Sequence, residues 1–374
     1  MKILYITTIG STMNFFKVLI RELIDEGHVV DIATNEALAP VADCYREWGC
    51  KVYPISCTRS PIHKGTITAI REIRQIVKDN GYDIVHCHTP VASICTRLAC
   101  RSLRKNGLKV LYTAHGFHFY KGAPLKNWLM YYPMEKLCAY FTDLLITINQ
   151  EDYQLAKAKM KARRVEYVPG VGLEIQKFQN AIAHRQQMRN ELGIPENAIL
   201  MTSVGELNAN KNHQVVIRAM GQLGMKNLHY MIVGKGALRE ELLHLAKELG
   251  MDANVHLVGY RTDIAQLYII SDICIFPSIR EGLGLAALEG MAVGLPVVAS
   301  DNRGTRDYAV HNDNAFLCPH DSVSAFAEAI QTLAADAALR QKMGAKNAVI
   351  AQQYDIGKIN TKMKEIYQSL EKNT

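Results

Sequence analysis

The chain has 374 residues, with a hydrophobic fraction of 48% and a charged fraction of 21%. These values are typical of a folded globular protein of two domains and exclude a disordered or fibrous chain. Apolar runs fall short of the roughly 18 residues that span a bilayer. The nine cysteines are scattered, and the N-terminus enters a strand-like run without a signal-peptide pattern, so we expect a cytoplasmic protein.

The net charge of +7 lies in the first half of the chain. Residues 1–175 hold 23 Lys and Arg against 16 Asp and Glu, whereas the remaining residues are balanced. A basic half favours an anionic partner, either a phosphate-bearing acceptor or an acidic membrane surface. We do not expect nucleic acid as a partner, because no recognisable nucleic-acid-binding motif accompanies the charge.

In the first half, short apolar runs alternate with amphipathic helical patterns such as Phe15–Glu26 and Thr66–Asn80. Strands that alternate with helices indicate a parallel sheet covered on both faces. The predicted strands are Lys2–Thr7, Val29–Ala33, Lys51–Ile55, Ile84–His88, Lys109–Thr113, Leu144–Ile148 and Arg164–Val168.

A turn-rich stretch, Pro169–Gly172, interrupts this alternation and precedes a polar segment, Glu174–Leu192, that we predict to be helical. A second αβ series follows, and Ser322–Glu371 contains helical patterns only. The chain is therefore predicted to be α/β, with two Rossmann-like, doubly wound domains that face a central cleft. The predicted strands of the second series are Leu200–Val204, His229–Val233, Val255–Leu257, Ile273–Phe276, Pro296–Ala299 and Ala315–Cys318, and its predicted helices include Gln214–Leu223, Leu238–Leu249 and Leu285–Ala292.

The tripeptide His86-Cys87-His88 is the one pattern that suggests a metal. Adjacent side chains of a strand point to opposite faces, so His86 and His88 can share a face that Cys87 cannot join. We therefore interpret it as the end of a strand, with a metal site as the less favoured alternative.

Ligands bind outside the carboxyl ends of parallel strands, and the loop most typical of such a site is Pro277–Glu289. Gly282 and Gly284 allow close backbone approach, and the start of the following helix suits phosphate oxygens. Glu281 and Glu289 are eight positions apart, about 12 Å at helical rise. Because carboxylates accept hydrogen bonds from vicinal hydroxyls, this pattern predicts a nucleotide-diphospho-sugar site. A capped helix followed by a solvated glutamate is the alternative.

Other loops of the second half offer weaker patterns. Gly205 opens a loop that carries Lys211, whose ammonium can neutralise a diphosphate; solvent exposure is the alternative. Gly234 follows another strand, where a tight turn explains it equally well. Farther along, Tyr260 can flank a base beside Arg261, or be an ordinary packed surface residue.

In the first half, Gly10 follows the first predicted strand, where backbone N–H groups can approach a phosphate. The full G-x-G-x-x-G pattern is missing, so a dinucleotide site is disfavoured. His115 comes just after a strand end, a position that suits a catalytic histidine; a structural histidine is the alternative.

The stretch Tyr120–Phe141 combines aromatic residues with lysines, and Arg101, Arg104 and Lys105 lie shortly before it. This composition is typical of an interfacial contact. Peripheral contact with an anionic membrane through the basic N-terminal domain is one expectation, and ordinary helix packing is the alternative.

Together, Glu281 and Glu289 behind Pro277-Ser278, the Gly205–Lys211 loop and His115-Gly116 resemble glycosyltransferase family 4 over nearly the whole chain. Members are retaining enzymes of the GT-B fold, whose last helix crosses back to the N-terminal domain. The resemblance implies an acceptor-binding domain over residues 1–172 plus about 356–374, and a nucleotide-sugar-binding domain over residues 173–355.

The resemblance also implies individual roles. His115 would face the reacting centre, Lys211 would pair with the diphosphate, and Glu281 would hold hydroxyls of the donor sugar. Glu289 would hold the ribose. The residues expected to bind the donor are Gly10, Gly205, Gly234, Tyr260, Arg261, Arg280, Gly282, Leu283, Gly284, Leu285 and Glu289.

One position departs from the family pattern. The family usually has an arginine after the glycine of the Gly205 loop, where this chain has Glu206. A carboxylate cannot pair with a diphosphate, so either Lys211 and the helix N-termini stabilise the leaving group by themselves, or another cation substitutes. Arg280 is our first candidate and Arg303 the second.

Longer segments of the sequence resemble bacterial enzymes of capsular and extracellular polysaccharide synthesis. This implies transfer of a hexose or N-acetylhexosamine from a UDP-sugar to an undecaprenyl-linked or other glycan acceptor, by an enzyme in the cytoplasm or peripheral to the inner face of the membrane. We expect no cofactor and no metal, because the sequence has no Asp-x-Asp. A UDP-sugar epimerase and a non-catalytic glycan-binding partner are the alternatives.

Overall fold

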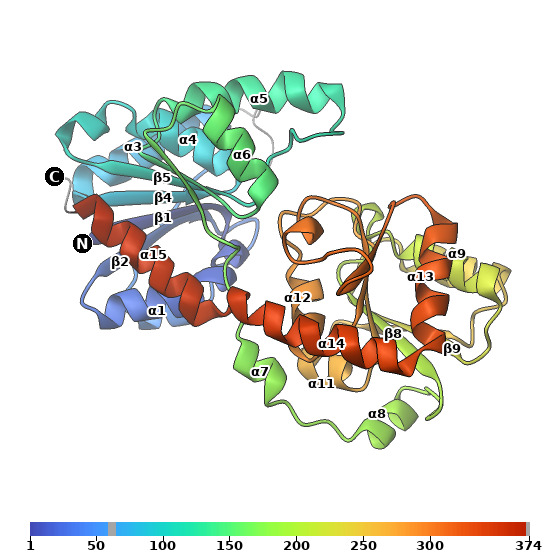
Figure 1. Ribbon diagram of the computed structural model, residues 1–374. Helices are drawn as coiled ribbons and strands as arrows, with labels where there is room; N and C mark the ends of the chain where they lie inside the picture. The colour runs from blue at the N-terminus through green and yellow to red at the C-terminus, as the bar shows by residue number, and fades with distance from the viewer. Residues whose placement is uncertain (59–64, 372–374) are drawn as a thin grey trace. The chain divides into compact units, whose positions relative to one another are not determined.

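The computed structural model describes residues 1–58 and 65–371, which form two compact units. Unit 1 comprises Met1–Val171 together with the C-terminal residues from Ile359 onward, and unit 2 comprises Gly172–Lys358. Each unit has its own parallel β-sheet, as Figure 1 shows.

The sheet of unit 1 has the strand order β3-β2-β1-β4-β5-β6-β7, and each neighbouring pair is parallel. The strand order reverses between β1 and β4, which makes their carboxyl ends the position where ligands bind in such sheets. The strands are β1 (Lys2–Ile9), β2 (Val29–Asn35), β3 (Val52–Pro54), β4 (Ile84–His88), β5 (Lys109–Ala114), β6 (Leu144–Thr147) and β7 (Arg164–Tyr167).

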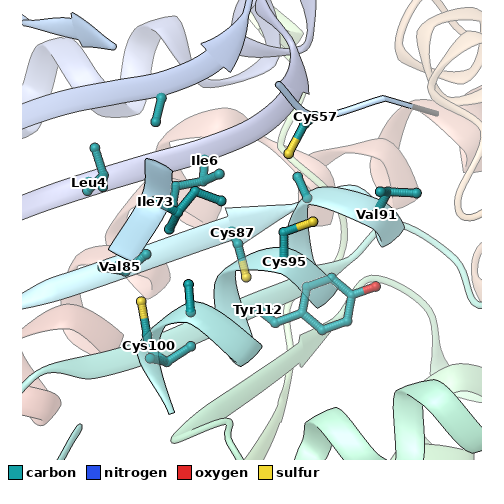
Figure 2. Packing of buried hydrophobic residues seen from close by; sticks show 14 of the residues in the cluster. Leu4, Ile6, Cys57, Ile73, Val85, Cys87, Val91, Cys95, Cys100 and Tyr112 are labelled. Atoms are coloured by element: carbon teal, nitrogen blue, oxygen red, sulfur yellow. The ribbon is translucent and has the colours of Figure 1, made fainter. Parts of the chain in front are cut away.

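Helices cover both faces of this sheet, because successive strand residues point to opposite sides. Leu4 and Ile6 pack with α3, α4 and α6 in the core shown in Figure 2, whereas Ile3 and Tyr5 pack with α1 and α15. The helices of unit 1 are η1 (Gly10–Phe16), α1 (Lys17–Asp25), α2 (Cys44–Glu47), α3 (Gly65–Asn80), α4 (Pro90–Cys100), η2 (Leu103–Asn106), α5 (Leu125–Ala139), α6 (Gln150–Lys159) and most of α15 (Ile356–Glu371).

Unit 2 repeats this plan with the strand order β10-β9-β8-β11-β12-β13, also parallel, so the order reverses between β8 and β11. Its strands are β8 (Ile199–Val204), β9 (Leu228–Val233), β10 (Val255–Gly259), β11 (Ile273–Phe276), β12 (Val297–Ser300) and β13 (Ala315–Cys318). Its helices are α7 (Ile175–Gln179), α8 (Arg185–Glu191), η3 (Ala209–Lys211), α9 (His213–Leu223), α10 (Arg239–Glu248), α11 (Ile264–Ile269), α12 (Leu285–Ala292), η4 (Thr305–Asp307), α13 (Val323–Ala335), α14 (Ala337–Ala351) and η5 (Gln352–Tyr354).

The last helix, α15, returns to unit 1 and completes its core, as predicted. Met363 and Tyr367 are buried against the sheet, and the Tyr367 hydroxyl lies 2.5 Å from the Tyr5 hydroxyl. This face of the unit 1 sheet therefore depends on residues from the far end of the chain.

The predicted single helix over Glu174–Leu192 is wrong, since two short helices, α7 and α8, occupy this segment. Phe178 is buried in α7, and Arg189 is fully buried in α8. The Arg189 guanidinium donates to the Ile270 carbonyl and to Asp272. These separate anchors override the helical pattern of the sequence between them. Within residues 1–58 and 65–371, no helix is long and apolar enough to cross a membrane.

Candidate functional site

Two loops of unit 2 meet where the strand order reverses, because β8 and β11 are adjacent in the sheet. The loop after β8 carries Lys211, and the loop after β11 carries Glu281. Asn210 joins them, since its carbonyl accepts from the Ile279 N–H at 2.8 Å and its side-chain amide donates to the Arg280 carbonyl at 3.0 Å. The topology and these two hydrogen bonds bring the predicted residues together.

Lys211 and Glu281 form an ion pair, with 2.7 Å between Nζ and Oε1 and with 22% and 18% of their side chains exposed. The Asn208 side chain accepts from the Lys211 N–H at 3.0 Å and so fixes the loop. A Cβ added at Gly205 would lie 3.2 Å from the Lys211 side chain. Glycine at position 205 therefore leaves room for the lysine stem.

Helix α12 begins directly after this pair. Its N-cap is Gly284 with φ of 93°, and no side chain caps the helix. A Cβ on Gly284 would lie 2.6 Å from the Phe276 ring. This position therefore requires glycine for two reasons, the positive φ and the lack of space for a side chain. The Ala287 N–H donates to the Gly284 carbonyl at 3.1 Å, whereas the N–H groups of Leu285 and Ala286 have no acceptor within the helix and can receive an anion. Gly282 and the buried Leu283 lead the chain into this turn.

Glu289 lies farther along α12 and is the most perturbed carboxyl group of this region. Burial raises its pKa from 4.5 to about 7, although Lys177 and Lys211 oppose the shift. In the described part of the chain, the Glu289 carboxyl accepts no hydrogen bond. A desolvated carboxyl without a partner can accept hydrogen bonds from ligand hydroxyls. The sequence does not indicate a role for Lys177, because α7 lies far from α12 along the chain.

The other predicted donor-site glycine of unit 2 also has a close backbone neighbour. A Cβ on Gly234 would lie 1.9 Å from the Gly205 carbonyl oxygen, and the Gly234 N–H donates to the Gly259 carbonyl at 2.8 Å. Tyr260 follows and is 71% exposed. Arg261 is paired with Asp263, with 2.8 Å between Nε and Oδ1, so its charge is locally neutralised.

The two candidate replacements for the expected arginine have different surroundings. Glu206 itself is exposed and accepts from the Asn208 side chain at 3.0 Å. Arg303 is buried, and its Nε donates to the Glu281 carbonyl at 3.3 Å, which braces the loop. The half-buried Arg280 has no side-chain partner in the described residues, so its guanidinium is the one available to a ligand.

In unit 1, Gly10 and His115 lie at the carboxyl ends of β1 and β5. The Gly10 N–H donates to the Ala39 carbonyl at 2.9 Å, and a Cβ would lie 2.5 Å from the carbonyl carbon of Pro40. Close backbone packing thus requires this glycine. His115 is half-buried, with Nε2 3.1 Å from Nδ1 of His88, and burial lowers its pKa to about 4.

The prediction that His86 and His88 share a face is confirmed, since their ring centroids are 4.1 Å apart. Cys87 lies in the core on the opposite face of the sheet. Among the residues that the structure describes, no three His, Cys, Asp or Glu side chains are grouped so that they could hold a metal ion.

In helix α5, three of the aromatic residues agree with the alternative of ordinary helix packing. Trp128, Tyr131 and Tyr132 pack against the core of unit 1, and Arg104 is held by Asp143 at 2.6 Å. The outward residues are mainly aliphatic: Leu125, Leu129, Met130, Met134 and Leu137 are exposed, together with Tyr140 beyond the helix. Lys126 and Lys136 on α5 are exposed as well, as is Lys121 shortly before the helix.

Comparison with known proteins adds independent information. Residues 184–349 match the family model described as glycosyl transferases group 1, and residues 2–149 match the model described as glycosyl transferase 4-like. The chain is 39% identical over 319 residues to EpsD of Bacillus subtilis, described as a glycosyltransferase, and this alignment covers 84% of each chain.

A second relative is the UDP-Gal:α-D-GlcNAc-diphosphoundecaprenol α-1,3-galactosyltransferase of Escherichia coli. It is 28% identical over 302 residues, which cover 78% of this chain and 77% of the relative. Among solved structures, HepE of Anabaena in complex with UDP-glucose superposes with a TM-score of 0.82 and 21% identity, over 99% of this chain and 100% of HepE. This likeness shows that the two chains share a fold.

Proposed function

The chain belongs to the group 1 glycosyl transferases and has the GT-B fold, and from this premise we propose that it transfers a hexose or N-acetylhexosamine from a UDP-sugar to a lipid-linked or other glycan acceptor, with retention of configuration. One observation carries the proposal. The ion pair of Lys211 and Glu281 lies at the uncapped start of α12, the helix that also carries the unpaired carboxyl of Glu289.

The proposed donor site uses each of these groups for one part of the ligand. The amides at the start of α12 and the Lys211 ammonium receive the diphosphate. Glu281 accepts from hydroxyls of the sugar, and Glu289 accepts from the ribose. Tyr260 offers an exposed ring to the base, and the free guanidinium of Arg280 supplies the second cation in place of the arginine that Glu206 replaces.

In the proposed reaction, the bond between the anomeric carbon and the UDP oxygen breaks while the acceptor hydroxyl forms a bond to the same carbon. Negative charge develops on the departing UDP, and Lys211, Arg280 and the α12 amides stabilise it. Attack from the face that UDP leaves retains the configuration without a carboxylate nucleophile. The departing phosphate accepts the proton of the acceptor hydroxyl, and His115 contacts the sugar.

The substrate classes draw support from the relatives. The name of the Escherichia coli enzyme specifies a UDP-sugar donor and a diphosphoundecaprenol acceptor, and HepE binds UDP-glucose. We therefore propose a UDP-sugar donor and a lipid-diphosphate-linked acceptor in bacterial surface polysaccharide synthesis.

The test is a panel of UDP-, GDP- and ADP-sugars scored by thermal shift, followed by transfer assays with the best donor and lipid-linked acceptors. Binding of a UDP-sugar should raise the melting temperature by mass action, and NMR of the product should show a retained anomeric configuration. Conversion of UDP-N-acetylglucosamine without any acceptor would indicate an epimerase instead, and an inverted product would refute retention.

We also propose that unit 1 contacts the cytoplasmic face of an anionic membrane through the outer face of α5. Exposed leucine and methionine side chains beside lysines suit the boundary between headgroups and acyl chains. Vesicle flotation tests this proposal, with Leu125→Gln/Leu129→Gln as the variant. Val349→Gln on α14, which removes an equally exposed apolar side chain, is the control. Binding that survives the double substitution would contradict the proposal.

A further inference from the structure

Three histidines come together at the carboxyl ends of β4 and β5 in unit 1. His86 and His88 are on β4, and His115 follows β5 by one residue. The hydrogen bond between His88 Nδ1 and His115 Nε2, at 3.1 Å, joins the two strands. No part of the proposed reaction uses His88, so the purpose of this bond is open.

His88 is held rigidly by the rings around it. It is 1% exposed. Tyr5 lies parallel to it at 5.5 Å with an interplanar angle of 14°, and the Phe16 centroid is 4.3 Å away. The free space beside these rings is only about 30 Å³. The imidazole of His88 is thus a fixed support and not a mobile side chain.

His86 packs against the His88 ring, with 4.1 Å between the ring centroids, and is itself fixed. Its Nδ1 lies 2.7 Å from the Tyr367 hydroxyl, and its Nε2 lies 2.8 Å from the Thr113 hydroxyl. Both nitrogens of His86 are therefore occupied, and His86 has no hydrogen bond to His115. This makes His86 a matched control, because it shares the burial of His88 but not its contact.

His88 and His115 are both neutral, because burial lowers the pKa of His115 to about 4 and that of His88 well below its ordinary value. A hydrogen bond between two neutral imidazoles needs one ring as donor and the other as acceptor. The tautomers of the two rings are consequently coupled. In the described part of the chain, His88 Nε2 is buried without a hydrogen-bond partner, and a buried N–H without a partner is costly. The proton of His88 therefore lies on Nδ1, which donates to His115 Nε2, so the proton of His115 lies on its own Nδ1. Among the described residues His115 has no other hydrogen bond, which leaves this N–H to donate to a ligand.

We propose that His88 is a positioning residue for His115: the bond between them selects one tautomer and one orientation of His115, and so decides how Nδ1 of His115 meets the sugar nucleotide. The inference rests on the proposed function, in which His115 contacts the donor sugar. It extends the site to a second histidine that touches no substrate.

The first experiment compares three variants by kcat/KM and by affinity for UDP-glucose and for UDP. His88→Leu fills the space without a polar atom, whereas His88→Asn keeps an amide near the position of Nδ1. We expect His88→Leu to lose about tenfold or more in kcat/KM and in affinity for UDP-glucose, but not for UDP. His88→Asn should recover most of the loss, and His86→Leu should leave the ratio of the two affinities unchanged.

Equal losses in His88→Leu and His88→Asn, or an equal loss of UDP and UDP-glucose affinity, would overturn the proposal. The second experiment needs no variant that could fail to fold. In ¹⁵N NMR spectra of the full-length protein, imidazole shifts should show His115 in a single neutral tautomer, and a mixture of the two tautomers overturns the proposal. If no sugar nucleotide binds the wild-type protein, the proposed function fails, but these spectra still decide the role of His88.

Discussion

Lys211 Nζ lies 2.7 Å from Glu281 Oε1 across two loops that follow neighbouring strands. Each group is the counter-ion of the other. Binding of a diphosphate would draw the ammonium toward the ligand and release the carboxylate to hydroxyl donors. In the proposed site, the pair thus holds both charged groups at the start of α12, and ligand binding exchanges their mutual contact for contacts with the diphosphate and the hydroxyls.

The first prediction concerns Lys211→Met, which keeps the apolar stem and removes the charge. We expect kcat to fall by about 10²–10³, because in the proposed reaction the cation stabilises charge on the departing nucleotide. Lys346→Met on the surface, where the lysine pairs with Asp313, should leave kcat unchanged. Steady-state kinetics of both variants provide the measurement, and a change within threefold for Lys211→Met would argue against this role.

The second prediction concerns Glu289→Gln and pH. The folded-state pKa of Glu289 is raised from 4.5 to about 7, so the folded state binds this proton more tightly than the unfolded state does. The contribution to stability is fully present below about pH 4.5 and is lost as the pH rises through about 7. We therefore expect Glu289→Gln to be more stable than wild type by roughly 1–3 kcal/mol at about pH 8, with little difference at about pH 4.5.

Urea unfolding of wild type and Glu289→Gln at both pH values measures this difference. The exposed Glu240→Gln serves as the control and should behave as wild type. Affinity of Glu289→Gln for UDP should fall despite the gain in stability, since the amide is a weaker acceptor for ribose hydroxyls. A stability difference that does not vary with pH would show that burial of the charge is not the cause.

The third prediction separates the two reasons for glycine at position 284. Gly81 also has a positive φ, of 61°, but open space where a Cβ would stand. Gly81→Ala should cost about 1 kcal/mol for the backbone conformation alone. Gly284→Ala should cost a further 1–3 kcal/mol, roughly, for the collision with Phe276, and should weaken UDP binding by displacing the start of α12. Equal costs for the two variants would mean that the Phe276 ring simply moves aside.

The fourth prediction concerns the buried ion pair of Arg97 and Glu135, which are 2.8 Å apart and join α4 to α5. Arg97→Met leaves a buried carboxylate without its partner and should destabilise the protein by about 3–5 kcal/mol. Arg97→Met/Glu135→Leu should recover part of this loss. Arg21→Ala, which breaks an exposed pair with Asp25, should change the free energy of unfolding by less than about 0.5 kcal/mol. If the double variant recovers none of the lost free energy of unfolding, a packing defect is the cause instead of the unpaired charge.

Parts of the fold could be predicted from the sequence because the turn residues and the hydrophobic periodicity indicate the same helix and strand bounds there. The bounds of β11 and α12 were predicted to the residue, since Pro277 ends the strand and Gly284 precedes the helix. The rule that ligands bind beyond the carboxyl ends of parallel strands pointed to the loops of Lys211 and Glu281, but the adjacency of β8 and β11 that brings them together is seen only in the structure. Local sequence signals were therefore sufficient where the residues that determine an element's ends lie in the same short segment as the element.

Features that depend on distant segments could not be predicted. The sequence does not reveal that Lys177 acts on Glu289, because the two residues come from helices far apart in the chain. In α5, apolar residues lie on more than one side, so composition alone did not determine that Trp128 faces the core and Leu129 faces outward. The hydrogen bond of His88 to His115 likewise depends on the register between β4 and β5.

The return of α15 to unit 1 has a consequence for biosynthesis. Met363 and Tyr367, which cover the Ile3 and Tyr5 side of the first sheet, are translated only after the whole of unit 2. While the ribosome is still adding residues 172–358, that side of the nascent first unit lacks its cover. Unit 1 can therefore reach its native packing only after unit 2 has been translated, although most of its residues precede unit 2 in the chain.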